Sequence, residues 1–203
     1  FNGFEIISMP PPSSGGIALI EMLNILEVLG IEKLAPASVE ARHLQIEAMR
    51  RAFLDRARLL GDPDFTGVPV DRLISKAHAR EVAASIDRHK ASSSVALGKD
   101  IVTTGSGQEA METTHLSVLD RNGMAVSQTY TLEGSYGSRV VAKGLGFLLN
   151  NEMGDFNKKP GETNTTGDIG TPANLIAPGK RMLSSMTPAI VTRNGRVVLI
   201  TGT

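Results

Sequence analysis

The residues with the clearest chemical potential are two adjacent threonines, Thr113 and Thr114, at the opening of a predicted β-strand. A threonine hydroxyl is a weak nucleophile unless a base removes its proton. When the threonine begins a chain, its own α-amino group, with a pKa of about 8, can be that base. Thr113 is internal, so this chemistry requires cleavage of the Glu112–Thr113 peptide bond. From the residues alone, Thr113 can equally be an ordinary β-branched strand residue.

Composition excludes several classes of function. The 203 residues suffice for one large domain or two small ones, and 21 basic residues balance 21 acidic ones, which argues against a general electrostatic role at nucleic acids or membranes. The chain has no cysteine, so thiol catalysis, disulfides and thiolate metal sites are excluded. Its four histidines lack metal-ligand spacing, and we predict no metal. No apolar run approaches the roughly 20 residues of a membrane span.

The first half of the chain predicts mainly helices. Ser38 is a candidate N-cap and Gly30 a candidate helix stop. Four arginines between 50 and 58 are interpreted as a solvated or ion-pairing face rather than a binding surface. The polar stretch 91–112 is predicted to be a loop or linker. The predicted elements are a strand at 4–9, helices at 17–29, 38–60 and 76–87, and a helical turn at 70–75.

The second half changes to a period of two, which predicts strands. Residues 114–119 and 125–131 flank Asn122-Gly123, a pair typical of type I′ hairpins, and Asn194-Gly195 repeats this device between two apolar runs. Residues 144–149 are predicted to form a further strand. The long Pro/Gly/Asn loop at 158–180 has the length of functional or disordered loops.

Several distinctive motifs occur in one order along the chain. They are Met-Pro-Pro-Pro-Ser-Ser-Gly-Gly (9–16), Gly-Asp-Pro-Asp-Phe (61–65), Glu-Thr-Thr-His-Leu-Ser-Val (112–118), Thr-Tyr-Thr-Leu (129–132), Gly-Phe-Leu-Leu-Asn-Asn-Glu-Met (146–153), Asp-Phe (155–156) and Leu-Ser-Ser-Met-Thr-Pro (183–188). Together they are similar to the motifs of the γ-glutamyltranspeptidase family, which belongs to the N-terminal-nucleophile hydrolases. The resemblance covers essentially the whole chain. It implies an α+β fold, the αββα sandwich of two sheets between helical layers, here incomplete.

The resemblance implies a role for each matching residue. Thr113 would be the nucleophile that autoproteolysis after Glu112 exposes, and Thr131 the hydroxyl that orients it. The resemblance further implies a substrate-binding set: Glu152 and Asp155 for the substrate's α-ammonium group, with Glu133 beside them, and Ser184 and Ser185 for its α-carboxylate. Without the family pattern, the acids are ordinary solvated loop residues and the serines a simple turn before Pro188. His115 is interpreted as a strand residue rather than a base.

Two positions depart from the family's pattern. Glu133 stands where the family commonly has Asn, which would place a third carboxylate near the ammonium pocket, and Gly154 replaces a common Asp. A third carboxylate could tighten cation binding or raise a neighbouring carboxyl pKa by repulsion, so substrate preference stays open. The family's oxyanion-hole glycines and its carboxylate-binding arginine have no counterpart in these residues. We therefore expect this 203-residue segment to be a fragment that is inactive alone.

The resemblance divides the segment at the nucleophile. Residues 1–112 would be the C-terminal part of the large-subunit region, and 113–203 the N-terminal part of the small-subunit region. The implied activity is that of a self-processing zymogen that cleaves γ-glutamyl amides such as glutathione. It would pass the γ-glutamyl group to water or to an amino-acid or peptide acceptor, without a cofactor. The implied location is periplasmic or secreted, and the implied protein partner is the rest of its own subunits. Two alternatives remain: a related cephalosporin-type amide acylase and a non-catalytic scaffold.

Overall fold

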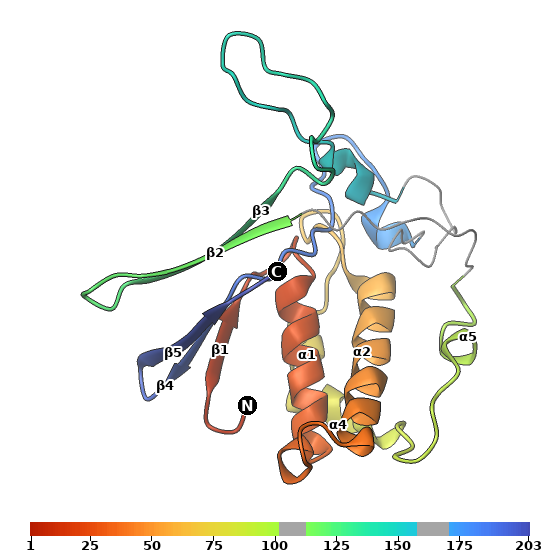
Figure 1. Cartoon of the computed structure of the whole chain (residues 1–203). Helices are drawn as coiled ribbons and strands as arrows, with labels where there is room; N and C mark the ends of the chain where they lie inside the picture. Colours follow the sequence, from red (N-terminus) through yellow and green to blue (C-terminus); the bar gives the residue numbers. More distant parts are fainter. Residues whose placement is uncertain (102–112, 158–170) are drawn as a thin grey trace.

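A computed structural model describes residues 1–101, 113–157 and 171–203. Three helices, α1 (Gly15–Val28), α2 (Val39–Leu59) and α4 (Lys76–Ala84), form one layer. A three-stranded sheet of β1 (Glu5–Ser8), β4 (Ala189–Arg193) and β5 (Arg196–Thr201) lies beside α1, as Figure 1 shows. The hairpin of β2 (Thr113–Leu119) and β3 (Ala125–Thr131) extends past the end of this sheet.

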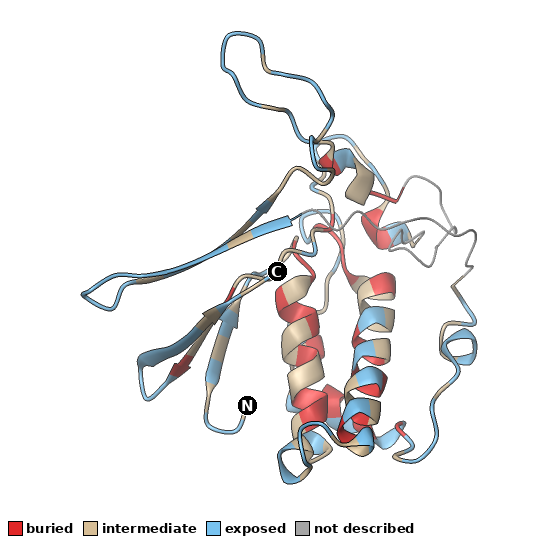
Figure 2. Cartoon of the chain, viewed as in Figure 1, coloured by how far each residue is buried: buried red, intermediate tan, exposed pale blue. Residues whose placement is uncertain are grey.

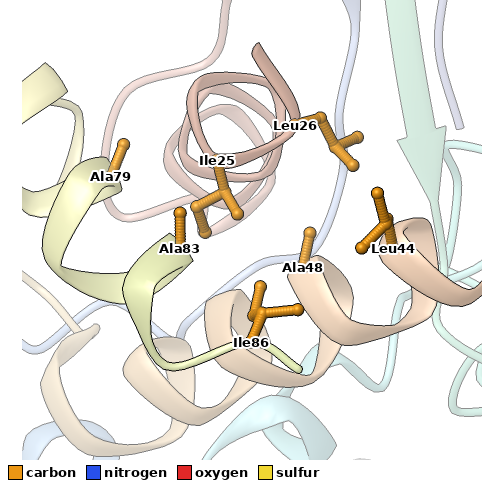
Figure 3. Close-up of a cluster of buried hydrophobic side chains, with 7 residues drawn as sticks. All are labelled: Ile25, Leu26, Leu44, Ala48, Ala79, Ala83 and Ile86. Carbon is orange, nitrogen blue, oxygen red and sulfur yellow. The ribbon is translucent and has the colours of Figure 1, made fainter. Parts of the chain in front are cut away.

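The helical layer follows from local signals and apolar packing. Ser38 and Ser75 each accept a hydrogen bond at the start of α2 and α4, from the backbone N–H of Ala41 and His78. Gly30 takes the left-handed conformation (φ 70°) after α1, confirming the predicted stop. The three helices enclose a core of small and branched side chains, drawn in Figure 3: Ile25, Leu26, Leu44, Ala48, Ala79, Ala83 and Ile86.

Contacts along the basic stretch of α2 confirm the ion-pairing interpretation. Arg51 is buried and its Nη1 lies 2.6 Å from Oε2 of Glu47. Arg58 pairs with Asp100. Two apolar residues of this helix, Met49 and Phe53, are nevertheless about half exposed, at 48% and 52%.

The sheet is antiparallel, in the order β1-β4-β5. Between β4 and β5, Asn194 (φ 52°) and Gly195 (φ 72°) are both left-handed, as a type I′ turn requires, so this predicted hairpin is confirmed. The prediction of the same turn at Asn122-Gly123 was wrong, because only Gly123 has a positive φ. There the Asp120 carboxylate accepts hydrogen bonds from the backbone N–H of residues 122 and 124 and builds a longer turn.

The remaining elements are short. They are the 3₁₀ helices η1 (Ile31–Lys33), η2 (Glu152–Asp155) and η3 (Pro172–Asn174), and the helical turns α3 (Val70–Leu73) and α5 (Ser94–Leu97). The predicted helix at 76–87 ends at Ala84. The strand predicted at 144–149 was wrong: Gly144 and Gly146 have φ of 81° and 75°, so the chain turns there, and only a single bridge pairs Val141 with Leu148.

Strand β2 of the β2–β3 hairpin is largely uncovered. Every residue of β2 except the intermediate His115 is exposed, and the hairpin is mostly pale blue in Figure 2, whereas the buried residues gather on the helices. Within the described ranges, no helix combines the length and the apolarity that a membrane crossing requires.

Candidate active site

Thr113 is the first residue of β2 and faces Thr131, the last residue of β3, in the hairpin register. In an antiparallel pair, directly opposite residues carry their side chains on the same face, within about 5.5 Å at Cβ. The Oγ1 atom of Thr131 accepts a hydrogen bond of 2.9 Å from the backbone N–H of Glu133, which fixes that hydroxyl. Thr113 and Thr131, the nucleophile and the orienting hydroxyl that the resemblance implies, therefore meet at one end of the hairpin, although they are 18 positions apart. Glu112 lies outside the described residues.

The face that carries Thr113 continues as a polar strip along the hairpin. His115 is hydrogen-bonded through Nδ1 to Thr129 Oγ1 (2.8 Å) and through Nε2 to Ser117 Oγ (3.1 Å). Ser127 donates to the carbonyl of Thr201 (2.8 Å), which ties the strip to β5. His115 thus contacts β3 through Nδ1 and a neighbour on its own strand through Nε2, in agreement with its interpretation as a strand residue.

The chain beyond Thr131 is hydrogen-bonded to the segment that contains the predicted ammonium ligands. The side-chain amide of Asn151 donates to Oε2 of Glu133 (2.8 Å), and its oxygen accepts from the backbone N–H of Gly134 (3.0 Å). The backbone N–H of Asn151 also donates to the carbonyl of Leu132 (3.1 Å). This places Glu133 against η2, which contains Glu152 and Asp155.

Three carboxylates therefore gather beside the end of β3: Glu133, Glu152 and Asp155. Glu152 is 9% exposed. Burial raises its pKa to about 7, with further contributions from the negative charges of Asp155 and Glu133. An ammonium group is the natural ligand for such a cluster, because it would relieve the repulsion and supply hydrogen-bond donors.

Ser184 and Ser185 belong to a different anchored segment. Ser184 pairs with Ser13 in a parallel bridge, and its carbonyl accepts from the backbone N–H (2.8 Å) and the hydroxyl (2.9 Å) of Ser14 at the start of α1. Its own Oγ accepts from the backbone N–H of Met186, an arrangement typical of a turn. Ser185 is exposed, so its hydroxyl can reach solvent or a ligand.

An anchor for that segment escaped the sequence interpretation. Asp62, fully buried, accepts from the guanidinium of Arg181 through both oxygens (2.5 and 3.0 Å), and Arg181 also pairs with Asp64. These bonds hold the pKa of Asp62 well below its usual range. The Gly-Asp-Pro-Asp motif at 61–64 thus fixes the position of the chain three residues before Ser184. The motif was visible in the sequence, but its partner, more than 100 positions away, was not.

A second cluster unites α1, α2 and α4 and was also missed. Nε2 of His78 lies 2.9 Å from Oδ2 of Asp55 and 3.3 Å from Oε1 of Glu21, and the donor atoms of all three residues lie within 4.8 Å of one another. Burial, followed by the charge of Asp55 and a hydrogen bond to it, raises the pKa of Glu21 to about 8. A proton on Glu21 would reduce the repulsion between the two carboxyl groups at this buried position.

Comparison with known proteins places the chain in a family. The sequence model of the family Gamma-glutamyltranspeptidase matches residues 1–203. The chain belongs to this family. It is 45% identical to the glutathione hydrolase proenzyme of Escherichia coli (strain K12) and 47% identical to that of Pseudomonas aeruginosa. Each match covers 100% of this chain and 34% and 36% of those proteins, respectively. The chain therefore spans about a third of the length of the curated relatives it matches.

Acylases also match the chain. The acylase ACY 1 proenzyme of Pseudomonas sp. (strain SE83) is 42% identical over 100% of this chain and 33% of its own length. Among solved structures, cephalosporin acylase from Bacillus halodurans superposes with a TM-score of 0.69 at 24% identity, covering 98% of this chain and 32% of that chain. This superposition confirms the predicted α+β fold, of which the chain holds a part.

Proposed function

We propose that the full-length protein containing this chain is a self-processing γ-glutamyl transferase and hydrolase with Thr113 as its nucleophile. The observation that carries the proposal is the register of the β2–β3 hairpin. It opens β2 at Thr113 and sets the hydroxyl of Thr131, itself fixed by the backbone of Glu133, directly opposite. Family membership supports the same assignment.

The proposed processing step is an attack of the Thr113 hydroxyl on the carbonyl carbon of Glu112. The Glu112–Thr113 peptide bond breaks, an ester to the threonine oxygen forms, and the former amide nitrogen becomes the free α-amino group of Thr113. Water then hydrolyses the ester. Residues 1–112 and 113–203 would thus belong to the large and small subunits of the mature enzyme, together with the rest of each subunit.

In the mature protein, the free amine of Thr113 takes the proton from its own hydroxyl as that hydroxyl attacks a γ-glutamyl amide. The amine of the donor leaves with a proton, and the γ-glutamyl group remains as an ester on Thr113. Water or an amino-acid or peptide acceptor then takes over the acyl group. Glutathione is the proposed donor, since relatives that match the whole chain are named glutathione hydrolases.

The proposed donor subsite consists of the three carboxylates at η2 for the α-ammonium group and of Ser184 and Ser185 for the α-carboxylate. Charge complementarity supports the pairing of the carboxylates with the ammonium group, and the serine hydroxyls are suitable donors to the α-carboxylate. From family membership we further propose that the full-length protein is exported to the periplasm or secreted. A second candidate function, hydrolysis of other acyl amides such as those of acylated β-lactams, is favoured by the 42% identity to acylase ACY 1.

The test is to express the full-length protein and measure intact masses and N-terminal sequences. We expect two pieces, one of which begins at Thr113. Thr113→Ala is expected to leave a single folded precursor, whereas Thr114→Ala, the matched change at the neighbouring hydroxyl, is expected to leave the cleavage position unchanged. A wild-type protein that folds and stays intact would favour a scaffold role. Cleavage of Thr113→Ala at the same bond would exclude the proposed nucleophile. Rates on γ-glutamyl and acyl-lactam amides then separate the two candidate activities.

A further inference from the structure

The Glu133 carboxylate occupies the space that a side chain would take at Gly154, the third residue of η2. A Cβ built on Gly154 would lie 2.0 Å from Oε1 and 2.5 Å from Cδ of Glu133, far inside contact distance. The backbone of Gly154 is not left-handed, so alanine would cost no conformational strain there. The three atoms nearest to a side chain at position 154 all belong to the Glu133 carboxylate.

Glu133 is held in that space from two sides. Its backbone is left-handed (φ 70°), an uncommon conformation for a residue other than glycine, and its N–H donates to Oγ1 of Thr131. Its Oε2 accepts from the side-chain amide of Asn151 (2.8 Å). The position of the carboxylate is thus coupled to the end of β3, where Thr131 faces the proposed nucleophile.

The carboxylate of Glu133 borders a buried group that lacks a partner. Within the described parts of the chain, no donor lies within hydrogen-bond distance of Oε1 of Glu152, although this atom is buried and the residue only 9% exposed. A buried carboxylate oxygen without a donor costs free energy that a bound cationic donor would recover. After burial and the charge of Asp155, the negative charge of Glu133 also raises the pKa of Glu152.

We propose that Glu133 and Gly154 form a coupled specificity pair. Because Gly154 has no side chain, the Glu133 carboxylate can lie beside Glu152, and there it favours acyl donors that carry an ammonium group. The inference rests on the proposed function and adds the selection between two classes of donor. A γ-glutamyl amide carries the ammonium group, and a glutaryl amide is the same acyl group without it. Glu133 is a specificity residue here, because its charge acts on the ammonium group and takes no part in the acyl transfer.

The experiment measures kcat/KM of the processed full-length enzyme on γ-glutamyl-p-nitroanilide and glutaryl-p-nitroanilide, and takes their ratio. Glu133→Gln keeps the size of the side chain and an oxygen for Asn151 but removes the charge. We expect it to lower the ratio about tenfold, the order of a charge–charge contact in a partly exposed site. The loss is expected as a rise in KM for the γ-glutamyl donor.

The coupling is tested by a double-mutant cycle. Gly154→Ala is expected to displace the Glu133 carboxylate and lower the ratio several-fold in the wild-type background. In the Glu133→Ala background the space is vacant, so the same change at 154 is expected to leave the ratio unaltered. Gly67→Ala is the matched control, because a Cβ there meets nothing within 4 Å.

The outcomes are distinct. Equal effects of Gly154→Ala in both backgrounds would overturn the coupling, and an unchanged ratio in Glu133→Gln would overturn the charge role. A wild-type enzyme that uses both donors with equal efficiency would retain the Thr113 chemistry but overturn this inference. A wild-type protein that cleaves neither donor would overturn the proposed function itself, and this inference with it.

Discussion

Glu21 offers a sharp test of how the helical layer is stabilised. Its carboxyl group is 1% exposed and lies in the cluster with Asp55 and His78, where three helices meet. Burial and the neighbouring Asp55 raise its pKa from an ordinary value of 4.5 to about 8. At neutral pH the folded chain therefore holds a proton on Glu21 that the unfolded chain has released.

This difference in bound protons determines the sign and size of the pH dependence of the free energy of unfolding. Between pH 4.5 and 8 the folded state binds one more proton at this site, so the free energy of unfolding falls by about 1.4 kcal/mol for each unit of rising pH. At pH 7, roughly 2.5 pH units above the unfolded value, the accumulated cost is about 3 kcal/mol. Below pH 4.5 both states are protonated and the contribution vanishes.

Glu21→Gln removes the titration while keeping a donor for Asp55. We expect the variant to be more stable than the wild type by about 3 kcal/mol at pH 7, with the gain growing from pH 5.5 to 8. The assay is urea unfolding of the full-length protein across that range. Glu27→Gln is the control on the same helix. The hydrogen bond to Lys76 lowers the pKa of Glu27, so its contribution changes only below its unfolded pKa, and the slope from pH 5.5 to 8 should stay that of the wild type.

The reasoning would be refuted if Glu21→Gln and the wild type showed the same slope between pH 5.5 and 8. It would equally fail if the variant lost stability throughout this range, because that result would mean that the folded state needs the charge of Glu21. A changed slope in the Glu27 control would assign the pH dependence to net charge rather than to burial of Glu21.

Two further predictions concern the site. Because burial raises the pKa of Glu152 to about 7 and an ammonium group needs the anionic form, binding of L-glutamate to the processed enzyme should strengthen about tenfold from pH 6 to pH 8. Calorimetry checks this, and Glu152→Gln should flatten the profile. Gly61→Ala should destabilise the fold by about 1–3 kcal/mol, because its Cβ would lie 2.2 Å from the carbonyl oxygen of Ala173. Thermal unfolding beside Gly67→Ala, where the space is open, checks this, and equal midpoints would contradict it.

The parts of the fold that follow from neighbouring residues were predictable. The cap at Ser38, the stop at Gly30 and the two-residue turn at Asn194-Gly195 each depend on residues within a few positions. The wrong prediction of a type I′ turn at Asn122-Gly123 also has a local cause. The Asp120 side chain offers the backbone an acceptor, and this hydrogen bond prevails over the usual preference of the dipeptide. Apolar residues at 144–149 suggested a strand, but Gly144 and Gly146 turn the chain instead.

The contacts that position the candidate site are long-range, and a single sequence contains no signal for them. Arg181 reaches Asp62 across 119 positions, and the Ser184 carbonyl accepts from Ser14 across 170. The family resemblance named the residues of the donor subsite, but it did not indicate that the Glu133 carboxylate fills the space beside Gly154. Only the structure shows these two positions in contact.

The geometry at the end of the hairpin links the proposed nucleophile to the proposed donor subsite through one short path. Thr113 faces Thr131, the Thr131 hydroxyl accepts from the backbone of Glu133, and the Glu133 carboxylate borders Gly154 and is fastened to Asn151. A shift of residue 133 would therefore move both the hydroxyl proposed to orient the nucleophile and the charge proposed to attract the donor. Substitutions that remove the charge of residue 133 but keep its backbone conformation should alter donor selection. Substitutions that release its left-handed backbone should also slow acyl transfer. The distinction between those two classes of variant follows from the backbone hydrogen bond to Thr131.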